Sequence, residues 1–300
     1  MQRRLVVNAD DLGLTVGVNE GIFDVHEFGI VTSASLFANA PATAHAVRRA
    51  RSLPSLGVGA HLTLVDGTPT LPPHRVPTLV TDDGRFRRSW KPFIVACLLG
   101  RVSLAEVEQE LTAQVERLHD SGVTLTHLDA HKHVHGYPPV FLIVARLAAR
   151  FGIPVVRVPY EQWPGWSSSV GDSHQRRTTQ RQALLNAAMW PWAQRNYRTA
   201  ARLGLRTPTF TGRVHTGVLS RQTLRDALRA TTSADVELAV HPGYVDDALL
   251  QTTTRLRESR EHEVELLCSA ETRALLVDER VDLVRHDLAH VVRRRFRHVS

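Results

Sequence analysis

The sequence has few cysteines, no long apolar run and no recognisable leader segment. Two cysteines among 300 residues, Cys97 and Cys268, cannot form the disulfide framework of a small secreted domain. Both lie in helical, apolar patterns, and we interpret them as core residues. No run approaches the roughly 18 apolar residues of a membrane span, and the N-terminus lacks the small-residue cleavage site of a signal peptide. These absences predict a soluble protein of the reducing cytoplasm.

Lysine is almost absent, and arginine takes its place. Lys91 and Lys132 are the only lysines among 37 basic residues, which exceed the 30 acidic residues and give a formal net charge of +7. The arginines are scattered over predicted helices, apart from a dense patch at 293–297. Zinc-finger spacing, an RNA-binding aromatic motif and a heptad-linked basic region are all missing. We therefore expect no nucleic-acid partner, while the charge is compatible with peripheral contact with an anionic membrane.

Short β-rich runs alternate with helical patterns along the chain, which is typical of βα units on a parallel sheet. Strands are predicted over 5–9, 31–37, 58–64, 125–129, 155–158, 210–214, 236–240 and 281–285. Helices are predicted over 16–28, 41–53, 103–122, 138–152, 180–203 and 258–268, with a further one after Ser220. The third of these helices begins with the capping box Ser103-Leu104-Ala105-Glu106. With no repeat and no flexible linker, the sequence predicts an α/β fold with a single domain over 1–300.

Two long stretches lack a regular pattern. The first, 65–101, is rich in proline, glycine and aspartate, and the second, 159–180, contains Trp163, Trp166 and three serines. Loops longer than about 15 residues are usually functional, so we interpret both as excursions that cover a site. The two tryptophans are as suited to core packing as to stacking on a ligand ring.

Polar residues gather where four of the predicted strands end. Asp10 and Asp11 follow the first strand, His61 lies in the third, and His241 follows a late one as part of His-Pro-Gly. In parallel α/β folds, ligands bind beyond the carboxyl ends of the strands. Each residue alone has an ordinary explanation, because aspartate caps helices, buried histidines form hydrogen bonds, and His-Pro-Gly forms turns. Two adjacent carboxylates at a buried edge are harder to explain in this way, since like charges repel there.

The segment 127–135 is the least ordinary of these strand ends. Five carboxylate or imidazole side chains occur in its nine positions. Residues two apart share a face of an extended segment, so one wall is predicted to carry Asp129, His131, His133 and His135. A histidine-rich loop without a metal role is the alternative.

A carboxylate and imidazoles from different strand ends match a site for a divalent cation. Such an ion polarises a carbonyl group and lowers the pKa of a water molecule towards about 7. Asp10 beside Asp11 offers a carboxylate that can accept a proton, and His241 offers an imidazole that can return one. The absence of a nucleophile elbow, a P-loop and a dinucleotide-binding motif argues against a covalent serine mechanism.

These strand-end segments resemble the YdjC family of carbohydrate deacetylases, which includes chitooligosaccharide deacetylases and a branch associated with hopanoid biosynthesis. The resemblance extends over most of the chain in family order, and its matching segments are 7–13 (VNADDLG), 29–35 (GIVTSAS), 59–62 (GAHL), 126–135 (THLDAHKHVH) and 241–243 (HPG). Two shorter segments, 65–67 and 83–88, are more similar to the hopanoid branch.

The resemblance implies a distorted TIM-like (β/α) barrel of parallel strands that removes N-acetyl groups from an amino sugar. The substrate it implies is a glycan or a glycolipid, including a hopanoid glycolipid. By position, it implies one divalent ion, Mg²⁺ or Zn²⁺, on Asp11, His61 and His131, with Asp10 as general base and His241 as general acid. Asp129, His133 and His135 are then candidates that orient the ligands or line the substrate wall.

Two positions depart from the family pattern. Leu12 stands where the family often has phenylalanine, and Lys132 stands where the chitooligosaccharide branch commonly has histidine. Neither change removes a ligand, so both bear on substrate preference. A metal-dependent phosphoesterase and a non-catalytic protein that binds a sugar or lipid headgroup are the alternatives, and a homodimer is compatible with either.

Overall fold

The structure, a computed structural model, describes residues 3–162, 173–231 and 233–287, and one parallel sheet runs through them. Its strands are β1 (Arg3–Leu12), β2 (Ser33–Leu36), β3 (Gly57–Leu62), β4 (Leu125–Ala130), β5 (Val155–Val156), β6 (Thr209–Thr211), β7 (Asp235–Val240) and β8 (Val281–Leu283). They follow the order β5-β4-β3-β2-β1-β7-β6, and β8 pairs with β1.

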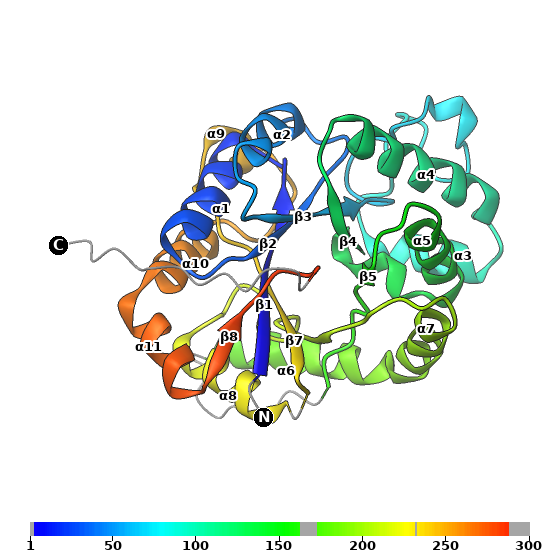
Figure 1. The fold of residues 1–300 in the computed structure, drawn as a ribbon. Helices are drawn as coiled ribbons and strands as arrows, with labels where there is room; N and C mark the ends of the chain where they lie inside the picture. Colours follow the sequence, from blue (N-terminus) through cyan, green and yellow to red (C-terminus); the bar gives the residue numbers. More distant parts are fainter. Residues whose placement is uncertain (1–2, 163–172, 232, 288–300) are drawn as a thin grey trace.

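The sheet curves towards a closed barrel of which β1 is one strand (Figure 1). The first residues of β1 pair with β8 and its last residues pair with β2, while β7 pairs along its other edge. Parallel bridges join Val155 to Arg206 and Glu161 to Phe210, so the chain at β5 reaches the chain at β6 from the opposite end of the strand order. The distorted α/β barrel expected from the sequence is therefore confirmed.

Helices cover the outside of the sheet on two sides (Figure 1). On one side lie α1 (Val16–Phe28), α2 (Thr43–Arg51), α10 (Glu258–Cys268) and α11 (Ala270–Asp278). On the other lie α3 (Trp90–Leu98), α4 (Leu104–Asp120), α5 (Pro138–Arg150) and α7 (Trp190–Arg202). The remaining helices are α6 (Ser173–Ala188), α8 (Arg221–Ala230), α9 (Asp247–Leu250), and the 3-10 turns η1 (Pro73–Arg75) and η2 (His131–Gly136). None of the helices in these described ranges is both long and apolar enough to cross a membrane.

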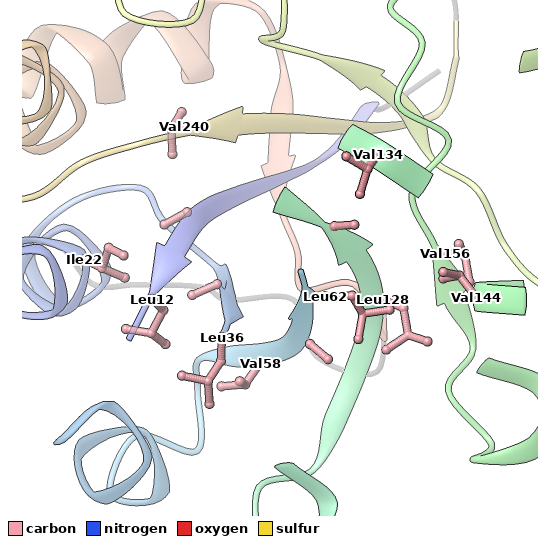
Figure 2. Close-up of a cluster of buried hydrophobic side chains, with 14 of the residues drawn as sticks. Leu12, Ile22, Leu36, Val58, Leu62, Leu128, Val134, Val144, Val156 and Val240 are labelled. Carbon is pink, nitrogen blue, oxygen red and sulfur yellow. The ribbon is translucent and has the colours of Figure 1, made fainter. Parts of the chain in front are cut away.

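The apolar core lies between these helices and the strands. Figure 2 shows part of it, with side chains from β1, β2, β3 and β4 among those labelled: Leu12, Leu36, Val58, Leu62 and Leu128. Successive residues of β1 such as Val6 and Val7 are buried, because a strand covered on both faces needs apolar side chains on both. The buried strands form a rigid frame from which polar side chains at their carboxyl ends are positioned.

Two of the predicted helical features differ in the structure. The helix predicted over 180–203 is two helices, α6 and α7, that meet at Met189, just before Pro191, whose nitrogen has no hydrogen to donate. The capping box at Ser103 is half formed: Ser103 Oγ accepts from Glu106 N at 3.4 Å, but the Glu106 carboxylate accepts from Thr78 N at 2.8 Å instead. The Glu106 carboxylate therefore binds Thr78 of the first excursion instead of capping its own helix.

The first predicted excursion, 65–101, is ordered and closely packed. It contains η1 and α3, and it buries Val76, Leu79, Phe86 and Phe93 against the core. In the second, Trp163 and Trp166 lie outside the described residues, and the predicted loop is already helical from Ser173 onwards.

Candidate functional site

The carboxyl end of β1 carries two neighbouring carboxylates on an irregular backbone. Pairing with β2 shifts register between Ala9 and Leu12, and Asp11 has a φ angle of 71° in the left-handed region. Side chains of successive residues in a regular strand point to opposite faces. The irregularity allows Asp10 and Asp11, which are both buried, to approach His61 from the same strand end. A non-glycine residue held in this conformation costs of order 1–3 kcal/mol, so the rest of the site must stabilise it.

Asp11, His61 and His131 form a group of three possible cation ligands. Asp11 Oδ1 lies 3.5 Å from His61 Nε2 and 3.2 Å from His131 Nδ1, and all three donor atoms lie within 4.8 Å of one another. The other Asp11 oxygen, Oδ2, accepts from Arg260 Nη2 at 2.6 Å, which leaves Oδ1 facing the imidazoles. One carboxylate oxygen and two imidazole nitrogens from three strand ends suit a divalent cation. The structure thus brings together the three residues predicted as ligands.

The His61 ring is oriented by a second carboxylate behind it. His61 Nδ1 donates to Asp129 Oδ1 at 2.7 Å, which leaves Nε2 facing Asp11. Burial alone would lower the pKa of His61, but Asp129 and Asp11 raise it to about 10. This electrostatic environment stabilises positive charge at the ring, and a cation on Nε2 would be stabilised by the same carboxylates.

Arg157 binds Asp10 through both of its terminal nitrogens. Nη1 donates to Asp10 Oδ2 and Nη2 donates to Asp10 Oδ1, each at 2.8 Å, and Asn8 Nδ2 donates to Oδ1 at 2.8 Å. Burial would raise the pKa of Asp10, but the Arg157 guanidinium holds it well below its usual range. Asp10 is therefore ionised and fixed in orientation. We call Asp10, Asp129 and Arg157 the inner wall of the site.

Arg157 was not among the site residues predicted from the sequence. It follows β5, is 1% exposed, and also lies 2.7 Å from Asp129 Oδ2 and donates through Nε to Glu237 Oε1 at 2.7 Å. A signal was present, because Arg157 and Glu237 each interrupt an apolar run predicted as a buried strand. Buried charges of this kind require partners. The sequence does not say that each is the other's partner.

His241 lies beside Asp10 at the end of β7. Its Nε2 is 4.0 Å from Asp10 Oδ2, and its backbone N–H donates to Glu263 Oε2 at 2.5 Å. Burial lowers the pKa of His241 to about 4, despite the nearby Asp10 carboxylate. The turn after it packs closely on α1, since a side chain at Gly21 would meet the backbone of Gly243 at 2.5 Å. A side chain at Gly243 would itself lie 3.0 Å from Val18 Cα, so the close approach to α1 favours glycine at both positions.

The extended wall predicted over 129–135 does not form. The strand ends at Ala130, and the chain turns into η2, where Lys132 and His133 have left-handed φ angles of 51° and 55°. Of the histidines at 131, 133 and 135, His131 is the one that faces Asp11. His133 packs edge-on against Phe210, and His135 Nε2 donates to the Arg157 carbonyl at 2.9 Å. The alternation of period two ends with the strand, so the prediction of a shared face was wrong beyond Asp129.

A second carboxylate, Asp66 of the first excursion, faces the other candidate histidine ligand. Asp66 Oδ2 lies 3.9 Å from His131 Nε2 and 2.5 Å from Lys132 Nζ, and Thr253 Oγ1 donates to Asp66 Oδ1 at 2.7 Å. We call Asp66, Lys132 and Thr253 the outer rim. In the sequence, 65–67 belongs to the segments that resemble the family, but no pattern there assigns Asp66 to the site.

Comparisons with known proteins find relatives and a similar fold. Residues 4–278 match the family model described as YdjC-like protein. A carbohydrate deacetylase from Brevibacillus brevis is 33% identical over 285 residues, which cover 94% of this chain and 97% of that protein. A carbohydrate deacetylase from Geobacillus stearothermophilus is 44% identical over 155 residues, covering 52% of this chain and 60% of that protein. The crystal structure of a putative cellobiose-phosphate cleavage protein from Enterococcus faecalis has a TM-score of 0.76 and 26% identity, covering 96% of this chain and 98% of that one.

Proposed function

Because this chain belongs to the YdjC-like protein family, we propose that it is a carbohydrate deacetylase, a hydrolase that removes an N-acetyl group from an amino sugar. The observation that carries the proposal is the cluster of Asp11, His61 and His131 beside the proton-transfer candidates Asp10 and His241. The relatives that cover nearly the whole chain bear the name carbohydrate deacetylase, which supports the same activity.

In this proposal Asp11 Oδ1, His61 Nε2 and His131 Nδ1 hold one divalent cation. Two nitrogen donors and one oxygen donor favour Zn²⁺ over Mg²⁺, since Mg²⁺ prefers oxygen ligands. When bound, the ion supplies Lewis acidity, polarising the acetyl carbonyl and lowering the pKa of water. Asp129 and Asp66 orient the two imidazoles from behind.

Asp10 is the proposed general base. Arg157 keeps its carboxylate ionised at neutral pH and fixes its plane, at some expense of basicity. As the oxygen of water attacks the acetyl carbon, Asp10 accepts the proton that the water loses. Glu237 Oε1 accepts from Arg157 Nε at 2.7 Å, so Glu237 keeps the guanidinium in place and acts as a positioning residue.

His241 is the proposed donor to the departing amine. Since burial lowers its pKa to about 4, its ring is neutral before the reaction and must first gain a proton. Asp10 Oδ2, at 4.0 Å from Nε2, is close enough to pass on the proton taken from water once small movements bring the two together. The C–N bond then breaks, the amine nitrogen receives the proton from His241, and acetate and the free amino sugar are the products.

The geometry is less suited to a phosphoesterase with two or three metal ions. Among the described residues, two groups of three possible ligands occur, and both use His61. The second group contains Asp10, whose two oxygens are bound by Arg157, and Asp129, whose oxygens are bound by His61 and Arg157. The described residues therefore suit one cation better than two or three.

Acetate release tests the proposal. The protein loaded with Zn²⁺ or Mg²⁺ is incubated with N-acetylchitobiose or with an N-acetylglucosaminyl lipid, including a hopanoid glycolipid, and free acetate is measured. We expect release from at least one substrate, suppressed by a chelator and restored by the metal. Acetate release that persists in a thoroughly chelated protein would exclude the assigned metal role, and hydrolysis of phosphate esters alone would exclude the deacetylase.

A further inference from the structure

We propose that the outward face of α3 docks on an anionic lipid surface. The docking surface consists of Lys91, Val95, Leu98 and Leu99, with Leu104 just beyond the helix. This inference rests on the proposed function, since it implies that the amino sugar is presented at a membrane.

The α3 helix is apolar on both of its faces. Its inner face buries Phe93 and Ala96 in the core. On its outer face, Val95, Leu98 and Leu99 recur at helical spacing and are 53%, 61% and 60% exposed. A helix that is apolar all round is normally covered on both sides, and the described residues cover only one. Figure 1 shows α3 at the periphery of the molecule, on the side of α4 and α5.

The exposed apolar side chains of this region lie close together in the sequence. Val95, Leu98, Leu99 and Leu104, which is 43% exposed, fall within ten residues of sequence. Single exposed apolar residues are ordinary on a protein surface, whereas a contiguous group marks an interaction site. Leucines on the outer face of a helix that lies flat on a bilayer are suited to the boundary between headgroups and acyl chains.

The charge around this group identifies the partner. The segment 84–105 contains five basic residues and no acidic one; the basic residues are Arg85, Arg87, Arg88, Lys91 and Arg101. Lys91 and Arg101 are exposed at opposite ends of the apolar face. Basic residues around exposed leucines are typical of helices that bind anionic lipids, where each added charge strengthens binding about fivefold at low salt.

A second copy of the chain fits this surface less well. In a two-fold dimer the same patch meets itself, so the basic residues of one copy would face those of the other. Like charges brought together in this way oppose association. An anionic bilayer satisfies the exposed apolar side chains together with Lys91 and Arg101.

The docking surface is connected to the rim of the candidate site. Arg88, which directly precedes Ser89 and α3, accepts from Lys132 Nζ through its carbonyl at 3.2 Å. Lys132 in turn binds Asp66 beside His131, and α3 contacts η2. The same excursion therefore contributes both the lipid-facing helix and a carboxylate of the site.

Vesicle co-sedimentation of the full chain tests the proposal. The probes are vesicles of phosphatidylcholine alone and of phosphatidylcholine mixed with phosphatidylglycerol. We expect binding to the mixed vesicles that weakens as salt is added. The double variant Leu98→Ser and Leu99→Ser should reduce partitioning about tenfold or more, because four or more buried carbon groups are lost from the lipid contact. The matched control is Leu184→Ser with Val277→Ser, two exposed apolar residues on α6 and α11 that are 69% and 74% exposed.

A charge series gives an independent test. Lys91→Glu with Arg101→Glu should abolish the preference for the mixed vesicles, whereas Arg48→Glu with Arg51→Glu on α2, both exposed, should not. All variants should release acetate from soluble N-acetylchitobiose as the unchanged chain does, which shows that they are folded.

Three results would overturn the proposal. They are absence of binding to the mixed vesicles, equal loss in the control variants, or a dimer in solution that Leu98→Ser with Leu99→Ser converts to a monomer. Vesicle binding without acetate release from any substrate would contradict the proposed function and leave the docking surface standing. Acetate release without vesicle binding would do the opposite.

Discussion

The inner wall and the outer rim each place a carboxylate behind one of the two candidate histidine ligands, but they do so with different means. Asp129 on β4 fixes the orientation of the His61 ring, because it is completely buried and its Oδ1 accepts from His61 Nδ1 at 2.7 Å. Asp66 lies on the excursion, 3.9 Å from His131 Nε2, and is shared with Lys132. The inner wall is thus fixed by strands and guanidinium bonds, whereas the outer rim is a partly exposed contact between loops.

This difference indicates a division of roles. Charges in the dry inner wall interact strongly and set the protonation of Asp10 and His61. Charges at the rim are screened by solvent, and their backbone, with left-handed φ angles at Asp66 and Lys132, differs from regular structure. We interpret the inner wall as the chemical part of the site and the rim as the part that adapts to the substrate.

The largest expected effect is on kcat, and it distinguishes loss of the proton acceptor Asp10 from loss of the metal ligands. Asp10→Asn should lower kcat by roughly two to four decades while metal binding persists, because the base is lost and the ligands remain. Asp11→Ala and His61→Ala should lose metal and activity together. Metal content by atomic spectroscopy, measured beside acetate release, checks this. Full turnover by Asp10→Asn would show that the assigned base is wrong.

Removal of the guanidinium tests whether the inner wall depends on Arg157. Arg157→Met should lower the free energy of unfolding by about 3–5 kcal/mol, because Asp10, Asp129 and Glu237 would be left buried without their shared cation. Chemical denaturation measures the change. Lys132→Met at the rim is the control and should cost no more than about 1 kcal/mol. Equal losses in both variants would remove the distinction between wall and rim.

Glu263 provides a buried carboxylate whose hydrogen bond comes from the backbone N–H of His241 rather than from a guanidinium. Burial raises its pKa to about 7, so the folded state holds this proton more tightly than the unfolded state. The stability that this group contributes is complete below its unfolded pKa of about 4.5 and falls as pH rises towards 7, by roughly 3 kcal/mol in total.

Comparison with Glu263→Gln isolates that contribution, since glutamine keeps an acceptor for the His241 N–H. We expect the free energy of unfolding of the unchanged chain to fall relative to that of Glu263→Gln as pH rises from 4.5 to 7. Denaturation curves at several pH values measure it. A difference independent of pH would mean that folding leaves the pKa of Glu263 at its ordinary value.

The smallest expected effect is on metal affinity, and it compares the carboxylates of Asp129 and Asp66. Asp129→Asn should weaken metal binding by about 10–100-fold, the usual consequence of removing the carboxylate behind a ligand histidine. Asp66→Asn should weaken it less, because its contact with His131 is longer and shared with Lys132. Titration calorimetry with Zn²⁺ on both variants gives the ratio. A larger loss at Asp66 would reverse the ranking of the two positions.

Local sequence patterns were sufficient for most of the elements. The helix predicted over 16–28 is α1, and the strands predicted from apolar runs lie where β1, β3, β4 and β7 are found. Patterns of this kind work because the burial of a helix stripe or of a strand is decided by nearest neighbours. They also placed Asp10, Asp11, His61 and His241 at strand ends, since parallel strands present their carboxyl ends at one edge.

Patterns failed where a residue's partner lies far away in the chain. The Glu106 carboxylate bonds to Thr78 rather than to its own helix, and the histidines after Ala130 diverge because the strand ends in left-handed turns. Neither outcome can be derived from a periodicity, because both depend on how an excursion packs.

The sequence by itself determined the α/β elements and the chemical inventory at the strand ends, because both follow from local burial and strand direction. Tertiary structure alone decided that Arg157 would clamp Asp10, 147 residues away, and that Asp66 would face His131. The reason is geometric: barrel closure sets which buried charges meet, and a charge in a dry interior is stabilised only by the partner that this closure brings to it.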